Sequence, residues 1–235
     1  DYLDTMVNSL NKEHLDLVIL GGDYIWIENS SFAKALVRLK QQDIYKNRRE
    51  AADLIFRSCA DCLGQISNKD GIIAVLGNHD RWEAGDAAKD IFQQYNLILG
   101  INTSYTVTRK NQNLEFILVD DYWTGFSSVR KFSLNKNKDS SRIIISHNPD
   151  FISKTLTEDK FRFDLALCGH THGGQVKIPG VGPLIKNIRD TRFMEGLVTP
   201  EGKACQVYTS RGIGMVEIPL RIDCPPEITI FTLTI

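Results

Sequence analysis

The sequence predicts an α/β domain in which helices alternate with short buried strands. Short apolar runs end in polar or glycine-rich turns, and they alternate with segments in which apolar residues recur at helical spacing. A chain of 235 residues, 42% hydrophobic and 24% charged, can form one domain with a substantial core. Because no linker, repeat or low-complexity segment interrupts the chain, we expect residues 1–235 to form a single domain.

Helices and strands alternate in the first hundred residues. Leu3, Met6, Val7 and Leu10 follow the i, i+3, i+4, i+7 pattern of a helix that leads into a buried strand. The helices expected in this half cover residues 3–10, 32–40, 48–66 and 86–95. The strands cover residues 15–20 and 72–76, and each ends at a glycine followed by polar residues.

Strands dominate the second half. Residues 103–109 and 114–119 flank a polar turn and are typical of a hairpin. Further strands are expected over residues 143–146, 165–168, 176–178, 204–209 and 228–235. The strand over 143–146 stops sharply at His147, and the strand over 165–168 stops at Gly169.

Charge and cysteine content exclude several classes of protein. With 28 Lys and Arg against 29 Asp and Glu, the chain lacks the basic excess of a nucleic-acid-binding protein, and no nucleic-acid partner is expected. The five scattered cysteines favour free thiols in a reducing compartment, with Cys59 and Cys62 in the core. No run approaches the roughly 20 apolar residues of a membrane span. We expect a cytoplasmic protein, and peripheral contact with the inner membrane stays open.

Polar residues that can bind metals follow four of the predicted strands. Ligands of open α/β sheets bind at the carboxyl ends of strands, so these side chains are expected to converge. One such residue alone is usually structural, whereas four groups in the same context favour a site. The groups are Asp23, the run Asn78-His79-Asp80, His147, and the pair His170 and His172.

The motif CGHTHGGQ at residues 168–175 places His170 and His172 two positions apart between glycines. Residues i and i+2 of an extended segment point to the same side, so both imidazoles are expected to face one cavity, on one ion or on two. Oxygen and imidazole ligands without thiolate suit Mn²⁺, Zn²⁺ or Fe. Two such ions activate water and stabilise an in-line displacement at phosphorus, which predicts phosphoester hydrolysis.

These blocks resemble those of the calcineurin-like metallophosphoesterases, in the same order along nearly the whole chain. Four segments are similar to the YkuE-like branch of this family: SHNPD (146–150), GHTHGGQVKIPGVGP (169–183), TSRGIG (209–214) and CPPEITIFTL (224–233). The resemblance implies a four-layer αββα sandwich of two mixed β-sheets with helices outside. It also implies two divalent metal ions, which we expect to be Mn²⁺ before Zn²⁺ or Fe.

The same resemblance assigns the metal ligands. Asp23 would bridge the two ions, and Asn78, His147 and His170 would complete one site. His172 would belong to the other site, together with an Asp-x-His block that has no counterpart at the start of this sequence. We expect the natural protein to carry that block on a preceding strand, and we expect the site of His172 to be weak in the chain as given.

The resemblance further places His79 near the scissile phosphate, as a general acid or charge stabiliser for the leaving oxygen. Asp80 would orient His79 and keep it protonated. Arg81 and Arg211 lie near predicted strand ends and are expected to bind phosphate oxygens.

For the substrate, the resemblance points to UDP-2,3-diacylglucosamine pyrophosphatases of the LpxG type, which form UMP and 2,3-diacylglucosamine 1-phosphate in lipid A biosynthesis. A helical insert over about residues 24–70 and apolar loops over 120–132 and 212–220 suit a nucleotide-lipid substrate or a membrane surface. Two alternatives stay open. One is a YkuE-like phosphodiesterase or phosphatase with another substrate; the other is a non-catalytic scaffold on the same fold, as in a retromer subunit. The oligomeric state is not predicted.

Overall fold

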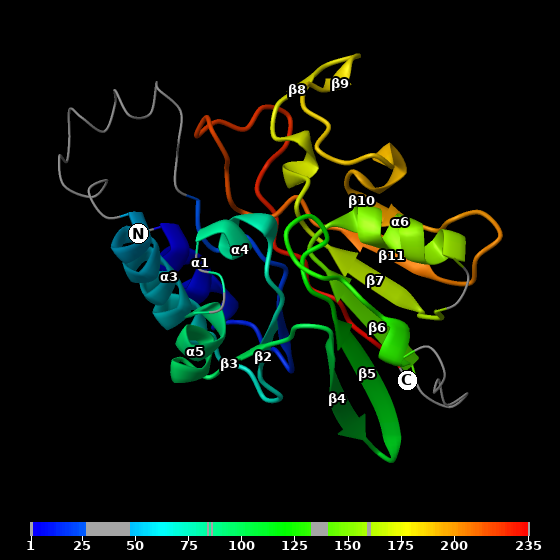
Figure 1. The fold of residues 1–235 in the computed structure, drawn as a ribbon, viewed down its shortest axis with the longest axis horizontal. Coiled ribbons are helices and arrows are strands. Elements are labelled where there is room, and N and C mark those ends of the chain that lie inside the picture. The colour runs from blue at the N-terminus through cyan, green and yellow to red at the C-terminus, as the bar shows by residue number, and fades with distance from the viewer. Residues whose placement is uncertain are drawn as a thin grey trace.

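Two β-sheets packed face to face form the centre of the structure, a computed structural model that describes residues 2–26, 48–83, 85, 87–132, 141–158 and 161–234. Three longer helices cover the outer face of one sheet, and a fourth covers the outer face of the other (Figure 1). The layers therefore run helix, sheet, sheet, helix. This order confirms the four-layer α/β sandwich expected from the sequence.

The smaller sheet has three parallel strands, β1 (Val18–Leu20), β2 (Ile72–Ala74) and β3 (Leu97–Leu99), in that order. The helices on its outer face are α1 (Tyr2–Leu10), α3 (Arg48–Gly64) and α5 (Ala87–Gln94). Phe56 of α3 is fully buried and stacks on Phe92 of α5, with ring centroids 4.9 Å apart. The apolar stripe that predicts α3 is thus the stripe that faces the sheet.

The larger sheet has six strands in the order β10-β11-β7-β6-β5-β4. Along that order they cover Gly196–Val198, Gln206–Thr209, Leu165–Cys168, Ser141–Ser146, Gln112–Leu118 and Thr103–Arg109. The four central strands are parallel, and β10 and β4 form antiparallel edges. Helix α6 (Pro149–Glu158) packs on the outer face of this sheet.

Alternation along the strands produces the layers. In β6, Ile143 and Ile145 face the smaller sheet, while Ile144 faces α6. In β2, Ile73 points between the sheets and Ile72 points toward the helices. Successive side chains of a strand point to opposite faces, so a central strand is buried on both sides. For this reason the strand sequences are continuously apolar.

Several short elements are not predicted from the sequence. They are β3, β10, β9 (Gly182–Pro183), the short helix α4 (Asn78–Glu83), α6, and the 3-10 turns Arg130–Phe132, His172–Gly174 and Thr191–Phe193. The antiparallel partner of β9, β8 (Lys177–Ile178), lies within the strand expected over residues 176–178. Helix α6 begins directly at the stop signal of β6. Asn148 Oδ1 accepts a hydrogen bond from Asp150 N at 2.9 Å, so the Asn-Pro pair that ends the strand also caps the helix.

One predicted strand is contradicted by the structure, and one predicted helix is not described by it. The strand expected over residues 228–235 is wrong, because residues 228–234 contain no strand and their large apolar side chains are exposed. Its alternating pattern is typical of a strand, but its described contacts with β11 are side-chain contacts, from Tyr208 to Thr229 and Phe231. The helix expected over residues 32–40 lies outside the described residues.

The five cysteines are free thiols, as expected, and Cys59 and Cys62 pack from α3 against the core of the smaller sheet. Among the described helices, none has both the length and the apolar character needed to cross a membrane.

The single domain and its helical insert over residues 24–70 stay predictions, since residues 27–47 are not described.

We expect Phe56→Ala to lower the free energy of unfolding by about 3–5 kcal/mol, because it removes a fully buried ring from the contact between α3 and α5. Leu54 on the same helix is 69% exposed, so Leu54→Ala serves as the control and should change that free energy by less than about 0.5 kcal/mol. Urea unfolding followed by circular dichroism measures both variants. Equal losses would contradict the packing of α3 against the smaller sheet.

Candidate metal centre

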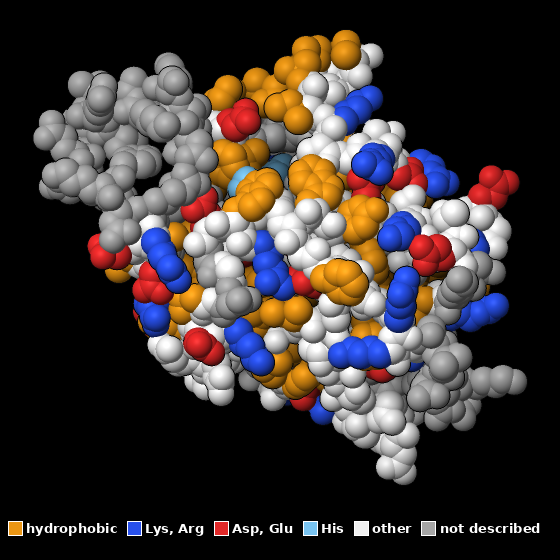
Figure 2. Space-filling model, in the orientation of Figure 1, with side chains coloured by type: hydrophobic (Ala, Val, Ile, Leu, Met, Phe, Trp, Pro, Cys, Tyr) orange, Lys and Arg blue, Asp and Glu red, His pale blue; other side chains and the backbone are white. Residues whose placement is uncertain are grey.

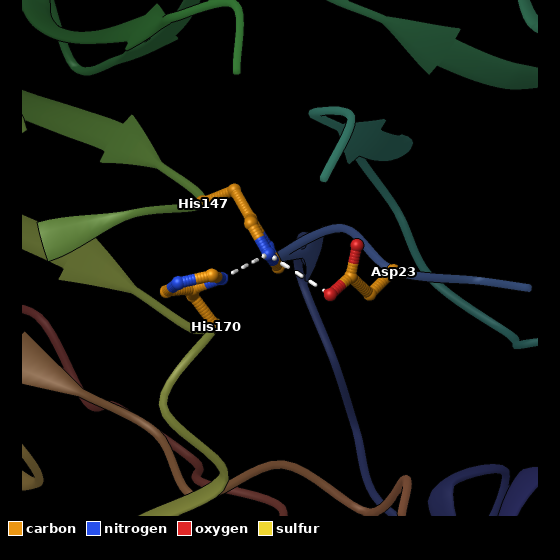
Figure 3. Close-up of side chains that lie close together, drawn as sticks. All are labelled: Asp23, His147 and His170. Atoms are coloured by element: carbon orange, nitrogen blue, oxygen red, sulfur yellow. Dashed lines mark hydrogen bonds and ion pairs between the residues drawn. The ribbon is translucent and has the colours of Figure 1, made fainter. Parts of the chain in front are cut away.

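Three side chains from loops after three different strands meet at one point. Asp23 follows β1 of the smaller sheet, whereas His147 and His170 follow β6 and β7 of the larger sheet. His147 Nε2 lies 3.1 Å from Asp23 Oδ2 and 3.2 Å from His170 Nδ1 (Figure 3). Ligand atoms of all three residues lie within 4.8 Å of one another. The structure thus brings these strand-end residues together, as the sequence predicts.

The spacing of these atoms fits a metal ion. Two ligand atoms at about 2.1 Å from one ion, at tetrahedral or octahedral angles, are about 3.0–3.4 Å apart. The two shortest separations in the cluster fall in that range. Asn78 Oδ1 is buried, and it has no hydrogen-bond partner among the described residues. An amide oxygen in that state is available to a ligand.

Each of the three site histidines lies with one ring nitrogen against a backbone carbonyl. The pairs are His147 Nδ1 with Gly21 O at 2.7 Å, His170 Nε2 with Asn187 O at 3.3 Å, and His172 Nδ1 with Gly214 O at 3.3 Å. A carbonyl only accepts, so each ring donates an N–H there. In His147 and His170 the other nitrogen faces the cluster, the arrangement that metal-binding histidines commonly show.

The loops of the two sheets come so close that one position requires glycine. Gly22 has φ of +97°, and a Cβ on it would lie 2.6 Å from Gly77 N and 2.7 Å from His147 Nδ1. Asp23 and His170 also have positive φ, +60° and +68°. A non-glycine residue in this region costs of order 1–3 kcal/mol, so strain is concentrated at two of the three clustered residues.

Asp80 fixes the loop that carries Asp23. Its carboxylate accepts hydrogen bonds from the backbone N–H groups of Asp23 at 2.7 Å and of Tyr24 and Gly77 at 2.8 Å. Burial, together with the charge of Asp23, raises the pKa of Asp80 to about 7. The sequence predicts that Asp80 orients the His79 ring. α4 directs this carboxylate at the backbone of the loop after β1, and an effect of Asp80 on the His79 ring stays a prediction.

His79 lies beside the cluster, in the first turn of α4. Its backbone N–H donates to Asp23 Oδ1 at 3.0 Å. Its ring makes edge-to-face contacts with Trp26 and Trp82, at centroid distances of 4.3 and 4.9 Å. Burial lowers the pKa of His79, although the Asp23 charge opposes this shift, so the imidazole is mainly neutral at pH 7. A neutral ring donates a hydrogen bond rather than a proton, so the lowered pKa favours the expected role of charge stabiliser over that of general acid, and the role itself stays a prediction.

Asp23 and His147 form a buried ion pair. Burial lowers the pKa of His147, but the charge and hydrogen bond of Asp23 outweigh it and raise this pKa to about 9. Burial raises the pKa of Asp23, and the His147 charge more than reverses that effect. Burial and the same His147 charge lower the pKa of His170 to about 3. A divalent cation at this point would replace the His147 proton, so its binding would release that proton.

His172 is not among the described residues that form this cluster. The segment around it is a turn, so the predicted extended conformation is wrong. His172 has φ of +51° and begins a 3-10 turn, and Thr171 is helical, with its hydroxyl accepting from Gly173 N at 3.1 Å. The glycines that follow make this tight turn possible. A separate metal site at His172 stays a prediction.

Three residues around the histidines are missed by the sequence interpretation. The Arg221 guanidinium donates to the carbonyl oxygen of His172 at 3.1 Å and to carbonyls of the loop over residues 211–214. The Trp123 ring makes an edge-to-face contact with His170 at 4.4 Å. Asn187 donates from its side chain to the His170 carbonyl at 2.8 Å. Arg221 and Asn187 do not follow a predicted strand, so no local signal identifies them. Trp123 lies in the apolar loop 120–132 after the predicted strand 114–119, but nothing in that loop indicates its contact with His170.

The two arginines expected to bind phosphate are in ion pairs. Arg81 Nε and Nη2 lie 2.9 and 2.5 Å from Asp120 Oδ1, and these side chains are 16% and 4% exposed. Arg211 Nε lies 2.5 Å from Glu227 Oε2. These partners are distant in sequence, so spacing could not reveal them. Phosphate binding by Arg81 or Arg211 stays a prediction, and it would compete with these carboxylates.

Comparison with known proteins agrees with this geometry. Residues 1–174 match the family described as calcineurin-like phosphoesterase. The chain belongs to this family. The phosphoesterase is 29% identical to phosphodiesterase YaeI of Escherichia coli strain K12, over 93% of this chain and 70% of that protein. It is 27% identical to the uncharacterized metallophosphoesterase YkuE of Bacillus subtilis strain 168, over 98% of this chain and 72% of that protein.

A solved structure shares the fold. The NAD nucleotidase NadN of Haemophilus influenzae aligns with a TM-score of 0.50 and 13% identity, over 88% of this chain. The phosphoesterase spans only 38% of the length of that nucleotidase. The likeness therefore concerns the fold alone.

Membership in the family defines the class of chemistry. The phosphoesterase is a metal-dependent phosphohydrolase, as the sequence predicts. The family implies divalent metal ions, and Asp23, His147 and His170 are the described residues whose geometry suits one.

We expect Gly22→Ala to abolish metal binding, because the new methyl group would collide with Gly77 N and His147 Nδ1 at a positive φ. Gly21→Ala is the matched control, since a Cβ there would meet nothing within 4 Å. Isothermal titration with Mn²⁺ compares the two neighbouring substitutions. Undiminished Mn²⁺ binding by Gly22→Ala would show that the two loops do not approach as closely as described.

We expect His170→Ala and His79→Ala to separate metal binding from turnover. His170→Ala removes a clustered ring nitrogen and should lose metal at one site, whereas His79→Ala leaves the cluster intact and should lose most turnover. Metal content after dialysis, measured by mass spectrometry, and the rate of phosphodiester hydrolysis are the two measurements. Equal metal loss in both variants would refute this division of roles.

Proposed function

We propose that the phosphoesterase is a Mn²⁺-dependent pyrophosphatase that hydrolyses UDP-2,3-diacylglucosamine to UMP and 2,3-diacylglucosamine 1-phosphate. An exposed apolar surface directly beside the metal centre carries the proposal. Figure 2 shows histidine side chains in a hollow between hydrophobic side chains, with more hydrophobic side chains gathered above it. A diphosphate joined to two acyl chains matches such a combination of charged and apolar surface.

Two segments form this surface, which we call the apolar rim. Residues 178–185, in the β8–β9 hairpin, contain no charged residue between Lys177 and Lys186. The exposed side chains of the hairpin are Ile178 (42%), Val181 (73%), Leu184 (58%) and Ile185 (62%). Those of the segment 215–222 are Met215 (42%), Ile218 (60%), Leu220 (47%) and Ile222 (44%). Monomeric proteins seldom expose so much contiguous apolar surface without a function.

Backbone hydrogen bonds join the two segments of the apolar rim. Lys177 N donates to Ile222 O at 3.0 Å, and Ile222 N donates to Gln175 O at 3.1 Å. The Gln175 side-chain amide donates to the carbonyls of Val216 and Ile218, each at 3.0 Å. The apolar rim is therefore held together by Gln175, which closes the CGHTHGGQ motif, and by Lys177, which follows it.

The apolar rim is attached to the site histidines at both ends. Asn187, two residues after Ile185, bonds His170 through its carbonyl and its side-chain amide. Gly214, directly before Met215, accepts from the His172 ring. Acyl chains bound to the rim would thus lie next to the site histidines, because each rim segment begins or ends within two residues of a residue that bonds one of them. The same surface would let the protein take its substrate from the inner face of a membrane.

In this proposal Asp23, Asn78, His147 and His170 hold one Mn²⁺, and Asp23 and His172 take part in a second, weaker site. Oxygen and imidazole ligands without thiolate suit Mn²⁺. When bound, the ions activate water and stabilise charge on the phosphorus oxygens. Asp80 contributes by fixing the Asp23 loop through three backbone amides.

His79 acts on the leaving oxygen. Its neutral ring carries one N–H, and Trp26 and Trp82 restrict the rotation of that ring. Donation of this N–H to the oxygen that departs from phosphorus stabilises the developing charge. The backbone hydrogen bond from His79 to Asp23 keeps the donor next to the metal ligands.

A second candidate function is hydrolysis of a phosphodiester without acyl chains, which the name of the Escherichia coli relative favours. A non-catalytic scaffold fits the centre less well. Such a protein has no physical need for a buried Asn78 oxygen without a partner, or for histidines whose ring nitrogens face one another.

UMP release from UDP-2,3-diacylglucosamine in the presence of Mn²⁺ tests the proposal, with UDP-N-acetylglucosamine as the substrate without acyl chains. We expect release from the first and little from the second, and a loss of at least tenfold in Val181→Asp. Leu54→Asp, at an exposed position of α3 outside the apolar rim, is the control and should keep the rate. Hydrolysis of bis-p-nitrophenyl phosphate with no UMP release would exclude this substrate and favour the second candidate.

A further inference from the structure

All three tryptophans of the chain contact histidines of the site. Trp26 and Trp82 both contact the His79 ring edge-to-face, and Trp123 contacts His170 in the same way. Trp82 is 58% exposed and Trp123 is 48% exposed, although large aromatic side chains are usually well buried. The centre is therefore flanked by two indoles with much of their surface open to solvent.

The contacts with histidine do not account for that exposed surface. The ring planes meet at 77° for Trp82 with His79 and at 84° for Trp123 with His170. An edge-to-face contact leaves at least one face of each indole free of the histidine ring. A smaller or more buried aromatic residue could support His79 or His170 as well as Trp82 or Trp123 does.

One ion pair fixes the segments that carry these two indoles. Arg81 directly precedes Trp82 in α4, and its partner Asp120 opens the loop that contains Trp123. Asp121 Oδ2 accepts from Trp123 N at 2.9 Å, and Asp120 Oδ2 accepts from Phe126 N at 2.9 Å. Arg81 and Asp120 thus join α4, which follows β2 of the smaller sheet, to the loop after β5 of the larger sheet. The exposed faces are preorganised rather than carried on free loops.

We propose that Trp82 and Trp123 form a recognition site for the nucleobase of a nucleotide whose phosphate lies at the metal centre. A base presents a planar aromatic face that stacks on indole, and such stacking contributes to affinity without requiring one particular base. The inference rests on the proposed function for the nucleotide half of the substrate. The apolar rim would receive the acyl half.

Binding of UMP and of ribose 5-phosphate to the Mn²⁺-loaded protein tests this inference by isothermal titration calorimetry. The two ligands share the sugar and the phosphate, and only UMP has a base. We expect UMP to bind about tenfold more tightly, and Trp82→Leu and Trp123→Leu each to remove most of that difference. Trp82→Phe and Trp123→Phe should keep part of it, because phenylalanine retains a stacking face.

Tyr2→Leu is the control, since Tyr2 is an exposed aromatic residue on α1, outside the site. This variant should keep the full preference for UMP. Equal affinity of the native protein for the two ligands, or an unchanged preference in both leucine variants, would overturn the inference. A preserved UMP preference in a protein that does not hydrolyse UDP-2,3-diacylglucosamine would support the base site and reject only the lipid substrate.

Discussion

The contact between Asp23 and His147 is the interaction on which the rest of the site depends. Each residue ends a strand of a different sheet, so the 3.1 Å separation of their side chains fixes how the carboxyl ends of the two sheets meet. The hydrogen bond from the His147 ring to Gly21 O adds a second link across the same boundary. A metal ion bound here would join the layers of the sandwich much as a covalent crosslink does, and its binding would stabilise the folded state.

Much of the site could be predicted because its residues are marked locally. A buried apolar run that stops at a polar side chain, with a glycine before it in three of the four cases, identifies Asp23, Asn78, His147 and His170. Parallel strands bring such stops to one edge. Periodicity predicts the helices and strands, since it depends on near neighbours in sequence, whereas the order of the four layers comes from the resemblance to the family. The strand expected over residues 228–235 fails because pairing also requires an adjacent edge, which periodicity does not report.

The roles of charged side chains could not be predicted in the same way. Asp80 and Arg81 are next to His79 in sequence, yet Asp80 binds backbone amides of the loop after β1 and Arg81 binds Asp120. Their partners are set by the direction in which α4 presents each side chain. The sequence does not predict this six-residue helix, because Gly77 and the polar residues after it are typical of a turn that ends a strand. The left-handed backbone of Asp23 and His170 is likewise a product of the surrounding contacts.

The two-way bond between Asn187 and His170 has a consequence for how the phosphoesterase can change in evolution. Asn187 holds the histidine by its ring and by its carbonyl, and the 3-10 turn His172–Gly174 and the β8–β9 hairpin lie between this pair along the chain. A substitution at the tip changes the apolar rim but leaves the spacing between His170 and Asn187 along the chain unchanged. An insertion or deletion in the hairpin would displace Asn187 and turn the imidazole. Its length is therefore under tighter constraint than its composition.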